Sequence, residues 1–158
     1  MAARHADASS GLDIAVTINA PPMVVLRAFF DASALATWWV VIRSVTTPRV
    51  LGAYAVEWPA TEYHDEILGR LGGVFRGTVM QYEAGRGFFV ADAYWLPPDG
   101  DPIGPMALEV SCTPRDSGTE LRITQRGFEE STRWRRYYEV AAVGWERALR
   151  SMKLLLEK

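Results

Sequence analysis

The amino-acid sequence predicts an α+β domain in which a curved antiparallel sheet of about six or seven strands surrounds a long C-terminal helix. Residues 12–18 alternate between apolar and more polar side chains, as a half-buried strand does. Short strand-like runs separated by turns fill residues 49–125, and after Gly127 the apolar spacing lengthens to that of one helix. Only that helix is long enough to cover the sheet.

The composition is typical of one globular domain. The chain has 158 residues, and its 17 basic and 19 acidic residues leave a net charge of −2, so we expect no binding to nucleic acid and no membrane insertion. Residues 1–11 lack the apolar run of a secretory signal and are expected to be a disordered tail before a domain at residues 12–158. The single cysteine, Cys112, fits a cytoplasmic protein.

Two short helices are predicted after the first strand. Pro21 and Pro22 end the strand and favour a first helical turn, so a helix is expected over residues 23–30. Asp31 can cap a second helix that ends near Trp38 and Trp39.

The middle of the chain predicts successive antiparallel strands. Clusters of turn-forming residues lie between the strand-like runs, at residues 84–87, 97–102 and 115–118. The first and the last of them join neighbouring runs into two hairpins. The polar stretch at residues 61–72 is expected to be a loop or a lid. The predicted strands cover residues 49–58, 73–83, 88–95, 106–113 and 119–125.

The last element is the clearest helix of the chain. Apolar side chains recur at helical spacing from Trp134 through Tyr138, Ala141 and Trp145 to Leu156, and charged side chains occupy the other positions. A curved sheet that wraps one helix leaves space between the two, and such spaces are common binding sites for small molecules.

Short segments with a recognisable order and spacing lie at residues 18–21, 28–31, 38–39, 51–54, 75–79, 118–121 and 144–145 with Leu149. Together they resemble the START-like, or SRPBCC, superfamily, and within it the branch homologous to the activator of the ATPase of the 90-kilodalton heat-shock protein. The resemblance implies a helix-grip, Bet v 1-like fold with a hydrophobic cavity. Members include lipid carriers, hormone receptors and polyketide aromatase/cyclases.

We expect the protein to bind a small hydrophobic molecule, aromatic or lipid-like, between the sheet and the terminal helix. Six tryptophans are unusual in so short a chain, and indole N–H and tyrosine O–H groups in a cavity need partners that a ligand can supply. No catalytic residue, metal or cofactor is predicted. The expected ligand-binding residues are Trp38, Trp39, Tyr54, Val56, Trp58, Phe75, Phe88, Asp92, Tyr94, Gln125, Trp134, Tyr138, Ala141 and Trp145.

Two alternatives remain open at this point. A cyclase-, aromatase- or hydrolase-like enzyme would use the same cavity and would need Asp92 to face inward with Tyr94 and Gln125, but the opposite register of that strand places Asp92 in solvent. A protein-interaction or chaperone-cofactor module would instead show an exposed apolar patch. His64 and its acidic neighbours are interpreted as a solvated loop and not as a metal site.

Overall fold

The computed structural model of the protein describes residues 2–7 and 11–158. These residues form an antiparallel sheet of eight strands, a separate two-stranded ribbon and three helices. The strands are β1 (Ala2–Asp7), β2 (Gly11–Ile18), β3 (Arg43–Thr46), β4 (Ala53–Trp58), β5 (His64–Asp65), β6 (Gly69–Arg70), β7 (Gly73–Glu83), β8 (Gly87–Leu96), β9 (Ile103–Arg115) and β10 (Gly118–Arg126), and the helices are α1 (Pro22–Arg27), α2 (Ala32–Trp38) and α3 (Thr132–Leu156).

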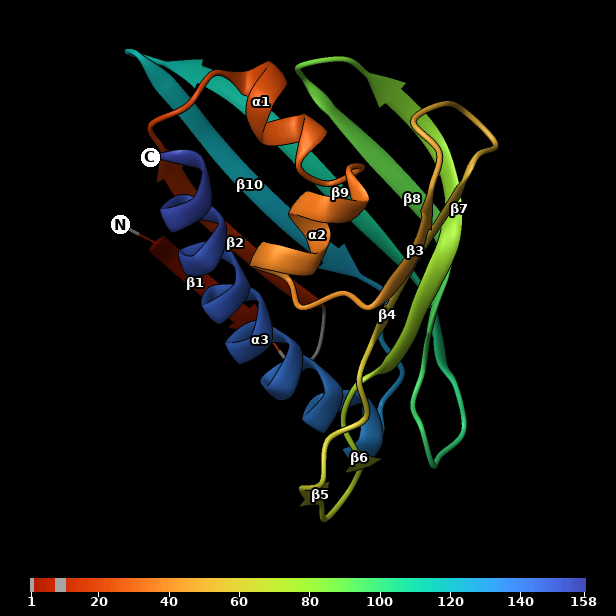
Figure 1. The fold of residues 1–158 in the computed structure, drawn as a ribbon. Coiled ribbons are helices and arrows are strands. Elements are labelled where there is room, and N and C mark those ends of the chain that lie inside the picture. The colour runs from red at the N-terminus through yellow and green to blue at the C-terminus, as the bar shows by residue number, and fades with distance from the viewer. Residues whose placement is uncertain (1, 8–10) are drawn as a thin grey trace.

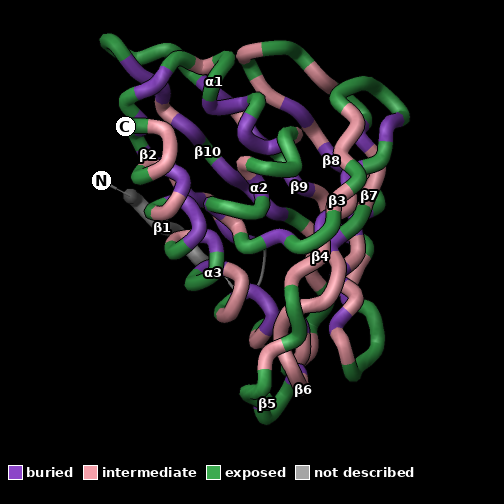
Figure 2. The backbone as a smooth tube through the Cα atoms, in the orientation of Figure 1, coloured by how far each residue is buried: buried purple, intermediate pink, exposed green. Residues whose placement is uncertain are grey.

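The sheet curves around the helices in the strand order β1-β2-β10-β9-β8-β7-β4-β3 (Figure 1). This arrangement confirms the predicted α+β fold, and the seven strands from β2 onward match the expected number. Figure 2 shows exposed positions gathering in the turns and buried ones along the strands that the helices cover. Across the described part of the chain, no helix combines the length and the apolar character that a membrane span needs.

Helices α2 and α3 begin where the sequence supplies capping side chains. The Asp31 carboxylate accepts the backbone N–H of Ala34 at 2.9 Å at the start of α2. The Ser131 hydroxyl accepts the N–H of Trp134 at 3.1 Å at the start of α3. Each cap satisfies a backbone donor that the helix itself leaves unpaired, so both helix starts are defined locally.

Helix α3 lies against one side of the curved sheet. Its backbone lies close to β1, β2 and α2. Strands β4 and β7 form the opposite part of the curved sheet (Figure 1). A helix displaced to one side leaves a wedge of space on the other, and the pocket described below occupies that wedge.

Three segments differ from the sequence-based expectation. Residues 43–46 form β3, a strand that the sequence did not predict. The strand expected from residue 49 begins only at Ala53, as β4. Residues 47–52 instead make the β3–β4 turn, with hydrogen bonds from Thr47 N–H to Ala53 O and from Gly52 N–H to Arg49 O. Within the stretch interpreted as a loop or lid, β5 and β6 pair as a small ribbon.

Part of the expected N-terminal tail has a regular backbone. Residues 2–7 form β1, which pairs antiparallel with β2, with Ala6 opposite Leu12. Gly11, placed in the tail by the sequence, is the first residue of β2. Residue 1 and residues 8–10 of that expected tail lie outside the described residues.

Candidate ligand-binding pocket

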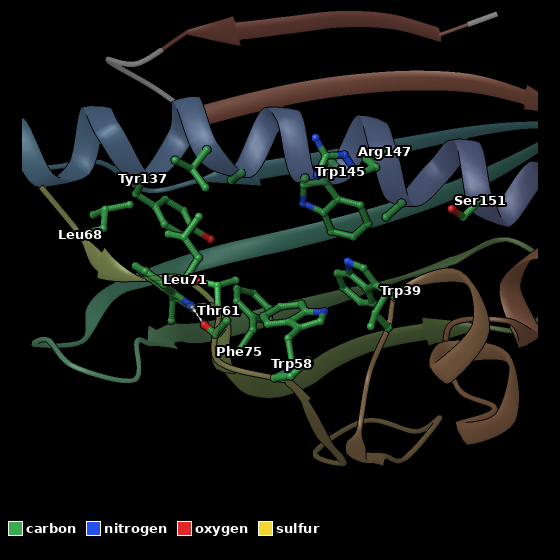
Figure 3. Close-up of a pocket in the computed structure, with 18 of the residues that line it drawn as sticks. Trp39, Trp58, Thr61, Leu68, Leu71, Phe75, Tyr137, Trp145, Arg147 and Ser151 are labelled. Atoms are coloured by element: carbon green, nitrogen blue, oxygen red, sulfur yellow. Dashed lines mark hydrogen bonds between the residues drawn. The ribbon is translucent and has the colours of Figure 1, made fainter. Parts of the chain in front are cut away.

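A pocket of about 470 Å³ lies between α3 and the part of the sheet formed by β4, β7 and β8 (Figure 3). Its walls come from α2, α3, four strands of the sheet and the segment at residues 59–72, so distant parts of the sequence meet there. The lining residues are Trp38, Trp39, Val40, Trp58, Pro59, Thr61, Leu68, Leu71, Gly72, Phe75, Trp95, Gln125, Tyr137, Val140, Ala141, Gly144, Trp145, Arg147, Ala148 and Ser151.

Half of the residues expected to bind a ligand line this pocket. They come from α2 and the residue that follows it, from β4, β7 and β10, and from α3. These residues are Trp38, Trp39, Trp58, Phe75, Gln125, Ala141 and Trp145.

The other expected residues do not line the pocket, and most belong to the core around it. Tyr54 is fully buried among Phe30 and Phe88, and its hydroxyl donates to the Phe29 carbonyl at 2.9 Å. The Tyr138 hydroxyl donates to the Gly127 carbonyl at 2.6 Å. The expected residues outside the pocket are Tyr54, Val56, Phe88, Asp92, Tyr94, Trp134 and Tyr138.

Asp92 is outside the pocket because β8 changes face in its middle. Phe88 and Val90 are buried, but between Val90 and Ala93 the strand contains one residue more than its partner β9, so Ala93 and then Trp95 become the buried positions. Asp92 sits in this bulge with φ 53° and is exposed. Each of the two strand registers considered from the sequence therefore holds for half of β8. The Asp92 carboxylate, which a cyclase-like mechanism would need, is not in the cavity.

One wall of the pocket is a cluster of stacked indole rings. Trp38 and Trp39 stack with centroids 4.9 Å apart and planes 7° apart. Trp39 also lies 4.6 Å from Trp145 on α3 and 5.3 Å from Trp58 on β4. The indole N–H of Trp38 donates to the Ala28 carbonyl at 2.9 Å, which fixes that ring. Flat apolar faces of this kind favour flat apolar ligands.

A hydrogen-bonded chain crosses the pocket between β10 and α3. The Trp145 indole N–H donates to Gln125 Oε1 at 2.8 Å, and Gln125 Nε2 donates to the Tyr137 hydroxyl at 3.2 Å and to Met106 Sδ at 3.3 Å. Burial raises the pKa of Tyr137 to about 12, although the hydrogen bond from Gln125 acts in the opposite direction. The phenol is therefore protonated at neutral pH.

The segment at residues 59–72 forms a wall that the sequence did not reveal. Leu68 and Leu71 line the pocket from it. The buried Asp65 carboxylate holds the segment in place: it accepts the N–H groups of Ile67 and Leu68, and Arg136 of α3 pairs with it at 2.6 Å. These hydrogen bonds, that from Arg136 foremost, lower the pKa of Asp65. The two leucines within a polar stretch were the available signal for this wall.

A second ion pair joins this segment to the β8–β9 turn. The Arg70 guanidinium donates from both Nε and Nη2 to the Asp99 carboxylate, at 2.7 and 2.8 Å. Arg136, one of the charged residues of α3, thus connects the helix to the pocket wall.

The mouth of the pocket runs along one stripe of α3. Gly144 lies on this stripe, and a Cβ atom added there would meet no atom within 4 Å. Arg147 and Ser151 continue the stripe towards the open end, and Figure 3 shows Arg147 beside Trp145. Among the described residues, no carboxylate lies within ion-pair distance of Arg147 and no three metal-ligating side chains converge.

Comparison with known proteins places this geometry in a family. The model of the family "Activator of Hsp90 ATPase homolog 1-like protein" matches residues 19–157. No protein of curated function matches the chain.

Solved structures with the same fold cover almost the whole chain. A protein of Chromobacterium violaceum has 24% identity and a TM-score of 0.68, over 92% of this chain and 96% of that one. CalU16 from Micromonospora echinospora has 18% identity and a TM-score of 0.64, over 99% and 83%. The Aha1 dimer from Colwellia psychrerythraea has 15% identity and a TM-score of 0.63, over 99% and 96%. Together with the family match, the pocket-bearing helix-grip fold identifies the chain as a member of the Activator of Hsp90 ATPase homolog 1-like family, within the SRPBCC, or START-like, superfamily.

Proposed function

We propose that the protein binds a small, mainly apolar molecule with a flat ring system in the pocket between α3 and the sheet. The observation that carries this proposal is Gly144. Glycine in the interior of a helix costs about 1 kcal/mol relative to alanine, and here no neighbouring atom excludes a side chain. Because Gly144 has no side chain, the pocket mouth stays open. The glycine therefore favours ligand entry although it does not favour the stability of the helix.

The shape and lining of the pocket support the same function. Its volume of about 470 Å³ lies within the range of small-molecule sites. Trp38, Trp39, Trp58 and Trp145 line the pocket, so indole rings form much of its wall. Few polar groups interrupt this surface, and Gln125 is held by the hydrogen-bonded chain described above.

A fluorescent binding assay tests the proposal. N-Phenylnaphthylamine is uncharged, flat and apolar, and its emission rises when it leaves water. We expect it to bind the native protein, and we expect Gly144→Leu to weaken that binding about tenfold or more, because the new side chain occupies the mouth. Val143→Leu adds bulk at the neighbouring exposed residue, outside the pocket lining, and serves as the matched control.

The outcomes of this assay are distinct. Unchanged affinity in a folded Gly144→Leu variant would show that the probe binds elsewhere, and absence of binding to the native protein would contradict the proposal. Native mass spectrometry of the protein purified from cells adds an independent readout, because a retained natural ligand appears there as extra mass that denaturation removes.

A second candidate function is self-association through the edge strand β3. Apolar side chains are exposed on and around this strand at Val40, Ile42, Val45 and Leu51, and β3 ends the sheet with one side unpaired among the described strands. Such an edge can add a strand from a second copy, and one structural relative is described as a dimer. We expect Val45→Lys to abolish any concentration-dependent dimer in light scattering; a dimer that persists in this variant would refute the use of β3.

A further inference from the structure

The hydrogen-bonded chain in the pocket has a fixed direction. An indole N–H can only donate, so Trp145 requires the oxygen of the Gln125 amide to face it. The amide nitrogen must then face Tyr137, and because that nitrogen can only donate, the Tyr137 oxygen is the acceptor. The order of the three side chains therefore determines which atom donates and which accepts in each hydrogen bond, without reference to hydrogen positions.

This direction leaves the Tyr137 hydroxyl hydrogen without an assigned acceptor. Among the hydrogen bonds of the described residues, none uses this O–H as a donor. Tyr137 is only 8% exposed, and Figure 3 shows its ring projecting from α3 into the pocket. A buried hydroxyl donor without a partner is unfavourable, so this hydroxyl favours a ligand that brings an acceptor.

Several other polar groups of the pocket lining are already paired, whereas no hydrogen bond of the described residues uses the indole N–H of Trp39 or Trp58. The Trp95 indole N–H donates to the Gly72 carbonyl at 2.8 Å, and the Thr61 hydroxyl donates to the Tyr63 carbonyl at 2.9 Å. Both hydrogens of the Gln125 amide are also used. The Tyr137 hydroxyl differs from these groups because Gln125 orients it: its oxygen already accepts from the amide, so its hydrogen is the group left for a ligand.

We infer that the ligand presents a neutral carbonyl oxygen to the Tyr137 hydroxyl, so that the pocket selects flat aromatic ketones or quinone-like compounds over hydrocarbons of the same shape. The acceptor is neutral because Arg147, the one charged lining residue among those described, lies at the mouth on α3, and a carboxylate buried without a cation is costly. This inference rests on the proposed binding function and names the chemical class of its ligand.

Fluorenone and fluorene provide a matched pair of compounds, because both are flat and tricyclic and they differ by a carbonyl group in place of a methylene group. We expect both to displace N-phenylnaphthylamine from the native protein. In Tyr137→Phe the affinity for fluorenone should fall about five- to tenfold, as expected for one hydrogen bond, whereas the affinity for fluorene should stay the same or rise.

Tyr138→Phe is the matched control variant. It removes a hydroxyl from the adjacent residue, whose partner is the Gly127 carbonyl outside the pocket, so the ratio of the two affinities should not change. An unchanged ratio in Tyr137→Phe would overturn the inference and leave the proposed function standing. Failure of the probe and of both compounds to bind the native protein would overturn both.

A measurement on the native protein avoids dependence on the variants. The infrared carbonyl stretch of bound fluorenone should lie at a lower frequency than in hexane, because a donated hydrogen bond weakens the C=O bond. A stretch at the hexane frequency, with fluorenone bound, would show that no donor reaches the carbonyl and would refute the role of Tyr137.

Discussion

At the scale of single residues, Gly144 links stability to binding. The first prediction is that Gly144→Ala raises the free energy of unfolding by about 1 kcal/mol, because alanine loses less backbone entropy in a helix and its methyl group meets no atom within 4 Å. Urea denaturation measures this change. A variant that is less stable than the native protein would show that the space around Gly144 is not open.

The bulge residue Asp92 gives a second prediction. Its φ of 53° lies in the left-handed region, which asparagine, aspartate and glycine tolerate and β-branched residues do not. Asp92→Val should therefore destabilise the protein by about 1–2 kcal/mol, while Asp92→Asn should change neither stability nor probe affinity, since the side chain is exposed outside the pocket. Weaker probe binding by a stable Asp92→Asn variant would show that Asp92 takes part in binding after all.

The sequence predicts burial well. It predicts less well which of the buried residues line the pocket. Ala141 and Trp145, which helical spacing selected, line the pocket from α3. The same spacing selected Tyr138 instead of Tyr137, although both are buried, because the buried stripe of α3 is wide enough to contain both and only the position of the helix on the sheet separates them.

At the scale of elements, the segment at residues 59–72 depends on Asp65. The third prediction is that Asp65→Asn lowers the free energy of unfolding by about 1–2 kcal/mol at neutral pH: asparagine can still accept the N–H groups of Ile67 and Leu68, but it loses the charge that pairs with Arg136. Hydrogen exchange of residues 61–71 should also accelerate. As a control, Asp99→Asn weakens a more exposed pair and should have a smaller effect.

The same carboxylate gives a dependence on pH. Because Arg136 and the backbone N–H groups lower the pKa of Asp65 in the folded state, its contribution to stability is complete above the ordinary aspartate pKa of about 4 and is lost as the pH falls through the lower folded value. The difference in unfolding free energy between the native protein and Asp65→Asn should therefore shrink only below about pH 4. A constant difference down to lower pH would contradict the ion pair.

The elements that the sequence did not predict share a physical reason. The alternation of β8 continues on both sides of Asp92, but a single extra residue exchanges the two faces, and no local pattern marks that insertion. β5 and β6 have two residues each, too few for any periodicity, and their positions depend on partners 29 and 71 residues away.

At the scale of the whole molecule, Cys112 provides a probe of global unfolding. It is buried on β9 next to β10 in the middle of the sheet, and burial raises the pKa of its thiol to about 12. The fourth prediction is that dithionitrobenzoate modifies the native protein at about pH 8 only as fast as the sheet unfolds. Urea should accelerate the reaction in parallel with loss of circular dichroism, and rapid modification of the folded protein would mean that β9 opens locally.

The overall arrangement could be predicted from the sequence because strand alternation, turn clusters and the long helix are local patterns that agree with one another. The pocket could not be placed in the same way. It exists because α3 lies close to β1, β2 and α2 and leaves the side near β4 and β7 open, and that displacement depends on contacts summed over the whole sheet.

The distribution of tryptophan has a practical consequence for optical spectroscopy. Five of the six indole chromophores, at residues 38, 39, 58, 95 and 145, line the pocket, and the rings of Trp38, Trp39 and Trp145 lie close enough for their excited states to couple. Most of the ultraviolet emission of the protein is therefore expected from rings that line the proposed ligand site. Any ligand that quenches or accepts that emission would report its own arrival, without a label.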